Sequence, residues 1–186
     1  MNQNNFFDND GWLKNANRVD SDNFNQRPTL KKDFLVVIHS ISLPPGQFNN
    51  SFIEDFFQNK LNPTLHPYFE TIKDLKVSAH FLIKRTGELI QFVSCHNRAW
   101  HAGESSWKGM SDCNDFSIGI ELEGADHIPF TEEQYKELAA VTRQIIASYP
   151  KIKADRIVGH SDIAPGRKTD PGPAFDWQKY RQLLID

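Results

Sequence analysis

Two short apolar runs that each end at a histidine place the strongest limits on how this chain can fold. Residues 34–38 are continuously apolar and rich in β-branched side chains, and they lead into His39. Residues 156–158 lead into Gly159 and His160 in the same way. Short runs of this kind are typical of strands that are buried on both faces of a sheet. We therefore expect each strand to carry its histidine to the edge of a sheet.

A loop rich in proline and glycine follows His160. The stretch 157–173 holds three prolines and three glycines, together with Lys168 and Asp170. Proline fixes φ and removes a backbone donor, so this stretch is expected to form a stiff loop rather than a helix. Stiff loops on a rigid scaffold are common locations for functional side chains.

The remaining patterns predict an α/β protein with about five strands and three helices. We expect segment 62–69, which holds two prolines, to be a loop. The other expected elements are a helix over 52–57 with Phe52, Phe56 and Phe57 inward, a hairpin of 77–83 and 89–93 around Gly87, a strand over 116–123, a helix from the capping box at Thr131 to Tyr149, and a helix over 175–184.

Length and composition indicate one domain of ordinary character. The chain has 186 residues, which suits a single well-buried domain, and we divide it into an extended lead-in over 1–30 that packs through Trp12 and a domain over 31–186. A net charge of -3 gives no electrostatic case for binding nucleic acid or an anionic membrane. Two cysteines and a start without a secretory signal favour the cytoplasm, and we expect a monomer.

The chemistry-bearing residues suggest a metal site. His39, His160 and Asp170 form a two-histidine, one-carboxylate set that is common for catalytic zinc, although ligand type alone leaves Fe²⁺ and Mn²⁺ open and Asp162 is an alternative carboxylate. Alternation along 116–123 points Glu121 and Glu123 to the same face, so either could be a general base.

Five ordered motifs resemble one family, the zinc-dependent N-acetylmuramoyl-L-alanine amidases, which are related to phage T7 lysozyme and the peptidoglycan-recognition proteins. The motifs lie at residues 36–39, 77–83, 98–103, 114–121 and 159–165. Further stretches are similar to its cytoplasmic, AmpD-type subgroup, which recycles cell-wall fragments. They lie at residues 11–13, 41–46, 66–69, 113–116 and 167–173.

This resemblance implies a single domain with a central mixed sheet and one zinc ion per chain. The ion would be held by His39, His160 and Asp170, with Glu121 and Lys168 as the catalytic side chains. The implied reaction is hydrolysis of the amide between the lactyl group of anhydro-N-acetylmuramic acid and L-alanine in muropeptides. Two alternatives are an amidase that acts on intact peptidoglycan and a recognition module that binds peptidoglycan without cleaving it.

Three more residues are candidates for the substrate site. We expect Trp100 and His101 to wall the sugar side of the groove, and we include His80, although its apolar surroundings favour a core or supporting histidine over a fourth ligand. Residues 110–112 lack the basic side chains expected in close relatives, which predicts weaker contact with substrate carboxylates.

Overall fold

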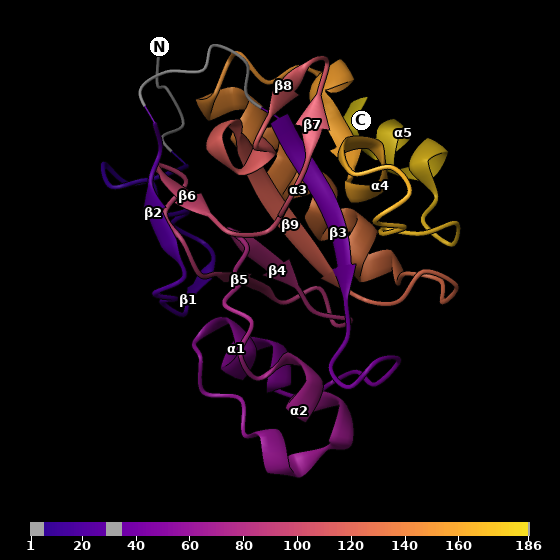
Figure 1. Cartoon of the computed structure of the whole chain (residues 1–186). Coiled ribbons are helices and arrows are strands. Elements are labelled where there is room, and N and C mark those ends of the chain that lie inside the picture. The colour runs from indigo at the N-terminus through magenta and orange to yellow at the C-terminus, as the bar shows by residue number, and fades with distance from the viewer. Residues whose placement is uncertain (1–5, 29–34, 186) are drawn as a thin grey trace.

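The chain is built around a mixed six-stranded sheet. A computed structural model describes residues 6–28 and 35–185, and within these ranges the strand order is β1-β5-β4-β9-β3-β10 (Figure 1). Neighbouring strands are parallel except for the antiparallel pair β4–β5. The strands are β1 (Asn17–Arg18), β3 (Leu35–Ile41), β4 (Phe81–Ile83), β5 (Leu89–Gln91), β9 (Ser117–Glu123) and β10 (Ile157–Gly159). The expected α/β fold with a central mixed sheet is confirmed. The sheet has six strands where about five were expected, and the described residues form five α-helices where about three were expected.

Helices α3 (Glu132–Ser148) and α5 (Trp177–Ile185) cover one face of the sheet (Figure 1). The capping box that predicted α3 is present, because Thr131 Oγ1 accepts from the Gln134 N–H and the Gln134 side chain accepts from the Thr131 N–H. The apolar side of β9 packs on these helices, with Ile118 and Ile120 in the same buried cluster as Leu138. This face is therefore the main hydrophobic core.

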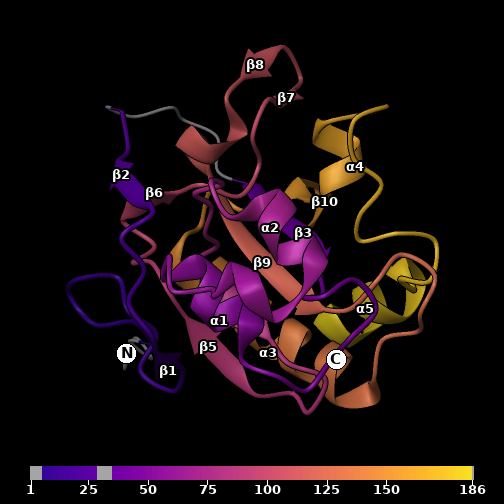
Figure 2. The ribbon, with the colours of Figure 1, turned by 60° about the horizontal axis from the view of Figure 1, so that its bottom comes forward.

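The opposite face is only partly covered by helices. Helices α1 (Phe52–Phe57) and α2 (Pro67–Ile72) pack over β4 and β5 through a second apolar cluster, and Figure 2 shows them in front of the sheet. In α1 the buried side chains are Ile53, Phe56 and Phe57, and the predicted Phe52 is only partly buried. The polar side of β9 faces the uncovered part of this side, where the functional residues gather.

The prediction of a loop over 62–69 is wrong. A 3₁₀ turn, η1 (Pro63–Leu65), and helix α2 both begin within this segment. In each case the proline occupies the first turn, where no backbone donor is needed, and a side chain caps the start. The caps are Asn62, which accepts from the Thr64 N–H, and His66, which accepts from the Tyr68 N–H.

The N-terminal segment is part of the sheet system. Strand β1 pairs with β5, and β2 (Phe24–Gln26) pairs with β6 (Asn97–Ala99). Its buried anchors are Phe7 and Leu13, whereas Trp12 is half-buried and has the Arg18 guanidinium over its ring. The predicted boundary at residue 30, and Phe34 of the first predicted strand, lie outside the described residues.

Several short elements complete the described part of the fold. They are the hairpin of β7 (Ser106–Trp107) and β8 (Met110–Ser111), the 3₁₀ turns η2 (Cys113–Phe116) and η3 (Ala154–Arg156), and helix α4 (His160–Ile163). Within residues 6–28 and 35–185, the chain forms no helix with the length and apolarity needed to cross a membrane.

Candidate metal centre and active site

Strand register brings the first candidate residues together. In the parallel pair β3–β9, His39 and Glu121 are Cα partners, and in the pair β3–β10, Ile38 is the partner of Gly159. His160 follows Gly159 and therefore emerges beside His39. Strand β3 continues past His39 to Ile41, so this histidine lies inside the strand rather than at its end as we expected.

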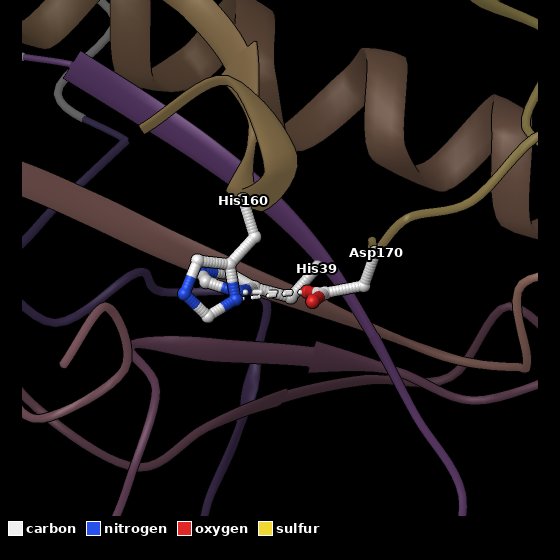
Figure 3. Close-up of side chains that lie close together, drawn as sticks. All are labelled: His39, His160 and Asp170. Atoms are coloured by element: carbon white, nitrogen blue, oxygen red, sulfur yellow. Dashed lines mark hydrogen bonds and ion pairs between the residues drawn. The ribbon is translucent and has the colours of Figure 1, made fainter. Parts of the chain in front are cut away.

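Three potential metal-ligand atoms, from His39, His160 and Asp170, lie close together, as Figure 3 shows. His39 Nδ1 lies 2.9 Å from His160 Nδ1 and 3.2 Å from Asp170 Oδ2, and His160 Nδ1 lies 3.0 Å from the same oxygen. Within the described ranges, these three residues are the group of histidine, cysteine and acidic side chains close enough to hold a metal ion. Asp162 is not in this group, because its carboxylate accepts from the Gly159 N–H at 2.7 Å.

The triangle fits a small tetrahedral cation. A tetrahedral zinc ion with bonds of about 2.0–2.1 Å places its ligand atoms about 3.3 Å apart. The observed separations of 2.9, 3.0 and 3.2 Å are close to that spacing, and only a slight opening of the triangle is required. Two nitrogens and one oxygen also leave a fourth coordination position open, which is the arrangement of catalytic sites.

The protonation states of His39 and Asp170 favour the binding of a cation. Removal from water lowers the pKa of His39 to about 4, although the adjacent Asp170 carboxylate opposes the shift, so this histidine is neutral at pH 7. Burial alone would raise the pKa of Asp170, but the adjacent imidazoles of His160 and His39 outweigh burial and hold the pKa of this carboxyl well below its usual range. Neutral imidazoles and an ionised carboxylate are the protonation states that bind metal.

A cleft of about 630 Å³ opens beside these ligands. Glu121, His160, Lys168 and Asp170 line it, together with a wall formed by Trp100 and His101. A smaller cavity of about 240 Å³ shares this wall, and Lys76, Arg167 and Lys168 line it. Residues 110–112 line neither cavity.

The two acidic residues of β9 have different surroundings. Glu123 is fully buried and accepts from the backbone N–H groups of Asn49 at 2.7 Å and Arg85 at 3.0 Å. Glu121 lines the cleft, and its Oε2 is buried with no hydrogen-bond partner among the described residues. Burial, and the nearby negative charge of Asp170, raise the pKa of Glu121 well above its usual range, with Lys168 opposing the shift.

His80 does not reach the cleft. It is fully buried, its Nδ1 accepts from the Gly119 N–H at 3.0 Å, and its Nε2 lies 3.1 Å from the Asn97 carbonyl oxygen. Burial and the adjacent Arg27 guanidinium lower its pKa to about 3. The structure thus gives His80 a supporting position behind Gly119, away from any substrate in the cleft.

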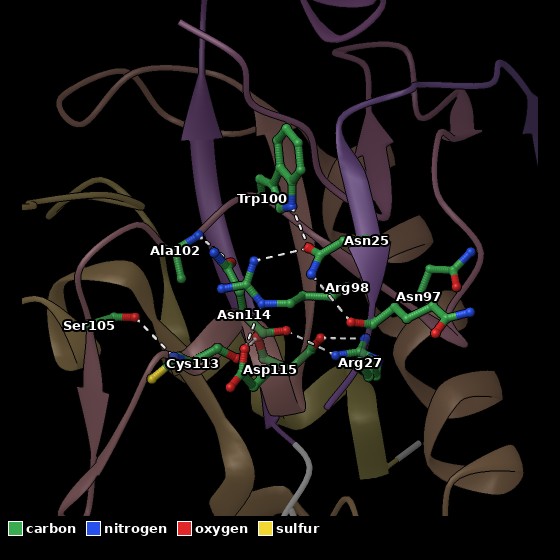
Figure 4. A network of polar contacts seen from close by, with 12 residues as sticks. Asn25, Arg27, Asn97, Arg98, Trp100, Ala102, Ser105, Cys113, Asn114 and Asp115 are labelled. Atoms are coloured by element: carbon green, nitrogen blue, oxygen red, sulfur yellow. Dashed lines mark hydrogen bonds and ion pairs between the residues drawn. The ribbon is translucent and has the colours of Figure 1, made fainter. Parts of the chain in front are cut away.

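A polar network that the sequence did not predict lies behind the cleft wall, as Figure 4 shows. Asn25 Oδ1 accepts from the Trp100 indole N–H at 2.7 Å, and Arg27 donates to the carbonyl oxygens of Asn114 at 3.0 Å and Ser117 at 2.8 Å. These contacts join the N-terminal segment to the wall and to β9. Trp100, Asn114 and Ser117 lie within the motifs at 98–103 and 114–121. Asn25 and Arg27 lie outside every motif, so no sequence signal linked them to the wall.

A family model described as N-acetylmuramoyl-L-alanine amidase matches residues 33–173. The chain belongs to the N-acetylmuramoyl-L-alanine amidase family. Within it, the chain is 55% identical over 174 residues to the 1,6-anhydro-N-acetylmuramyl-L-alanine amidase AmpD of Salmonella typhimurium, covering 94% of this chain and 92% of that protein.

Two solved structures of the family extend the comparison. A crystal structure of a selenomethionine derivative of AmpD is 52% identical and superposes with a TM-score of 0.92, covering 96% of this chain and 98% of that one. The Escherichia coli amidase AmiD, solved as a complex with the substrate anhydro-N-acetylmuramic acid-L-Ala-D-γ-Glu-L-Lys, is 31% identical with a TM-score of 0.60. That match covers 87% of this chain and 65% of AmiD.

Proposed function

We propose that this chain is a zinc-dependent amidase that cleaves the amide between the lactyl group of anhydro-N-acetylmuramic acid and L-alanine during cell-wall recycling. The observation that carries the proposal is the convergence of His39, His160 and Asp170 beside Glu121 in a substrate-sized cleft. The identity of 55% to an amidase named for the anhydro substrate supports the choice of substrate.

The metal is proposed to be zinc, held by His39 Nδ1, His160 Nδ1 and a carboxylate oxygen of Asp170. Two nitrogens and an oxygen with a tetrahedral spacing suit this ion. Bound zinc would supply Lewis acidity toward the amide carbonyl and would make a water molecule acidic enough to ionise near neutral pH.

Glu121 is proposed as the general base. Its carboxylate lines the cleft beside the ligand Asp170 and has a buried oxygen without a partner among the described residues. A raised pKa brings a carboxyl group closer to the working pH, where it can take a proton from the attacking water and later deliver it to the leaving amine.

Lys168 is proposed to stabilise the oxyanion that forms at the substrate carbonyl. Its side chain lines the cleft, and its positive charge acts on both His39 and Glu121, so it lies within electrostatic reach of the reacting atoms. A fixed cation at this point stabilises negative charge that develops in the transition state.

The two cavities that share Trp100 and His101 are proposed to divide the substrate. The larger cleft has apolar walls, including Leu43, Ile72 and Leu75, and suits the sugar. The smaller cavity offers the cations Lys76 and Arg167 to carboxylates of the stem peptide. These cations would take the part that sequence analysis assigned to basic residues near position 110.

We propose a cytoplasmic location as well, supported by the two cysteines, Cys95 and Cys113, which are both buried and free of disulfide bonds. Cell fractionation with an antibody to this chain would test the location. Recovery in the periplasm or the medium would contradict it.

The function is tested by mass spectrometry with two substrates, anhydro-muramyl tripeptide and intact sacculi. We expect release of free tripeptide from the anhydro substrate, loss of release with a chelator, and its return with zinc. The Glu121→Gln variant is the inactive control. Cleavage of sacculi at a comparable rate would indicate a wall-lytic amidase, and binding of both substrates without cleavage would indicate a recognition module.

A further inference from the structure

One dipeptide, His101–Ala102, contacts both histidines of the proposed metal site on the side away from the metal. His101 Nδ1 lies 2.9 Å from His39 Nε2, and the Ala102 carbonyl oxygen lies 3.0 Å from His160 Nε2. A carbonyl oxygen only accepts, so His160 carries its proton on Nε2 and presents the lone pair of Nδ1 to a cation. The orientation of His39 depends on which nitrogen of His101 carries a proton.

A series of hydrogen bonds determines which nitrogen of His101 carries the proton. Ser117 Oγ lies 2.6 Å from the Cys113 carbonyl oxygen, which can only accept, so the Ser117 hydroxyl donates there. Ser117 Oγ also lies 3.1 Å from His101 Nε2 and must accept from it. With its proton on Nε2, a neutral His101 has a free lone pair on Nδ1 and accepts from the Nε2–H of His39. His39 is thereby left with an unprotonated Nδ1 directed at Asp170 and His160.

Packing holds the His101 ring in this position. A Cβ atom on Gly119 would lie 2.4 Å from His101 Cγ, so the ring rests directly on β9 at a place where only glycine leaves room. The His39 and His101 rings meet edge to face with centroids 4.9 Å apart. The backbone is fixed too, because Asn114 Oδ1 accepts from the N–H groups of His101 at 3.0 Å and Ala102 at 2.8 Å. Figure 4 shows the Asn114 side chain beside Ala102.

We propose that His101 is a positioning residue that fixes the tautomer and ring orientation of His39 for metal binding. Ser117 in turn fixes the tautomer of His101 by accepting from its Nε2. This inference rests on the proposed metal site. It replaces the expectation that His101 binds the sugar through its ring, because both ring nitrogens already have partners inside the protein. Partners that orient a metal-binding histidine typically contribute about 10- to 100-fold to metal affinity.

The test measures zinc affinity of metal-free protein by competition with a chromophoric chelator, without reference to turnover. His101→Phe keeps a ring but removes both nitrogens, and we expect the zinc dissociation constant to rise by about 10- to 100-fold. His101→Gln can still accept from His39 through its oxygen and donate to Ser117 through its amide, so it should recover most of that loss. Trp100 lies on the same wall but takes no part in these hydrogen bonds, so Trp100→Phe should bind zinc like the wild type.

The outcomes separate this inference from the proposed function. Wild-type protein that binds no zinc would contradict the metal site itself. Wild-type and His101→Phe proteins with equal zinc affinity, together with a raised KM in the variant, would overturn the positioning role and return His101 to the substrate site. Circular dichroism checks that His101→Phe is folded. If it is not, Ser117→Ala decides the matter: weaker zinc binding supports the inference, and unchanged binding refutes it.

Discussion

Glu121 and Glu123 lie two residues apart on one face of β9, yet only Glu123 has protein partners for both carboxylate oxygens. Glu123 accepts from two backbone N–H groups, and Lys84 Nζ lies 3.8 Å from its Oε1. Glu121 keeps a buried oxygen without a partner among the described residues. Two carboxylates that look equivalent in the alternation of the strand are therefore expected to have separable effects on activity and stability.

Glu121→Gln should lower kcat by roughly 10²- to 10⁴-fold, the usual contribution of a general base. It should not lower stability, because the folded protein loses a buried carboxylate whose ionisation is unfavourable. Since the folded pKa is raised, wild-type metal-free protein loses stability as pH rises above about 4.3, and the variant does not. Urea unfolding of both metal-free proteins from pH 4 to 7 measures the difference, and parallel pH profiles would contradict it.

Glu123→Gln should show the opposite pattern. Losing a charged acceptor for the Asn49 and Arg85 N–H groups should lower the free energy of unfolding by roughly 1.5–3 kcal/mol. The folded variant should keep its kcat, since Glu123 does not line the cleft. Urea denaturation and steady-state kinetics below the unfolding transition check both parts. A large loss of kcat with unchanged stability would make Glu123 the base.

Asp170→Ala should abolish zinc binding and amidase activity while the fold is kept. Its carboxylate is one of the three converging donors, and His39 and His160 retain their other partners. Asp162→Ala is the matched control, because it removes only the acceptor for the Gly159 N–H, should cost about 1 kcal/mol, and should leave zinc binding intact. Zinc content by atomic absorption distinguishes the two, and full zinc occupancy in Asp170→Ala would show that the assignment is wrong.

Lys168→Ala should reduce kcat by about 100-fold or more with little change in KM, as expected for a charge that acts on the transition state. Lys168→Arg should recover part of the loss. Lys76→Ala, at a cation that lines the smaller cavity but not the larger cleft, should instead raise KM for substrates that carry peptide carboxylates. Initial-rate kinetics on anhydro-muramyl tripeptide separate the two effects, and a Lys168→Ala effect confined to KM would argue against the oxyanion role.

His80 should make the protein sensitive to acid. Its folded pKa of about 3 lies below the unfolded value of about 6.5, so the unfolded state binds more protons between these pH values. Its stabilising contribution is complete above pH 6.5 and is lost as pH falls toward 3, at up to about 1.4 kcal/mol per pH unit. His80→Gln can accept and donate in the same place without titrating. Its stability should change less over this window, and an unchanged acid limb would contradict the assignment.

Local sequence was sufficient to predict the helices and strands that depend on short-range features such as caps and side-chain alternation. The capping box at Thr131, the alternation over 116–123 and the apolar run before His160 each predicted an element that the structure contains. The prediction of a loop over 62–69 was wrong because it treated proline only as a helix breaker. Pro67 is the first residue of α2 and does not exclude a helix. A proline at the first helical position and a proline in a loop have the same local signature until the cap is seen.

The candidate site was likewise only partly predictable from the sequence. Sequence pattern and family resemblance nominated His39, His160, Asp170 and Glu121. The parallel register of β3 with β9 and β10 then brings His39 beside Glu121 and His160, which lie 82 and 121 positions further along the chain. The resemblance already preferred Glu121 over Glu123, and the tertiary structure supplied the physical difference between them. It also placed His80 against Gly119 and linked His101 to His39. Backbone preference and side-chain periodicity are local and can be read from sequence. The partner of a buried polar group is another part of the chain, so only folding determines it.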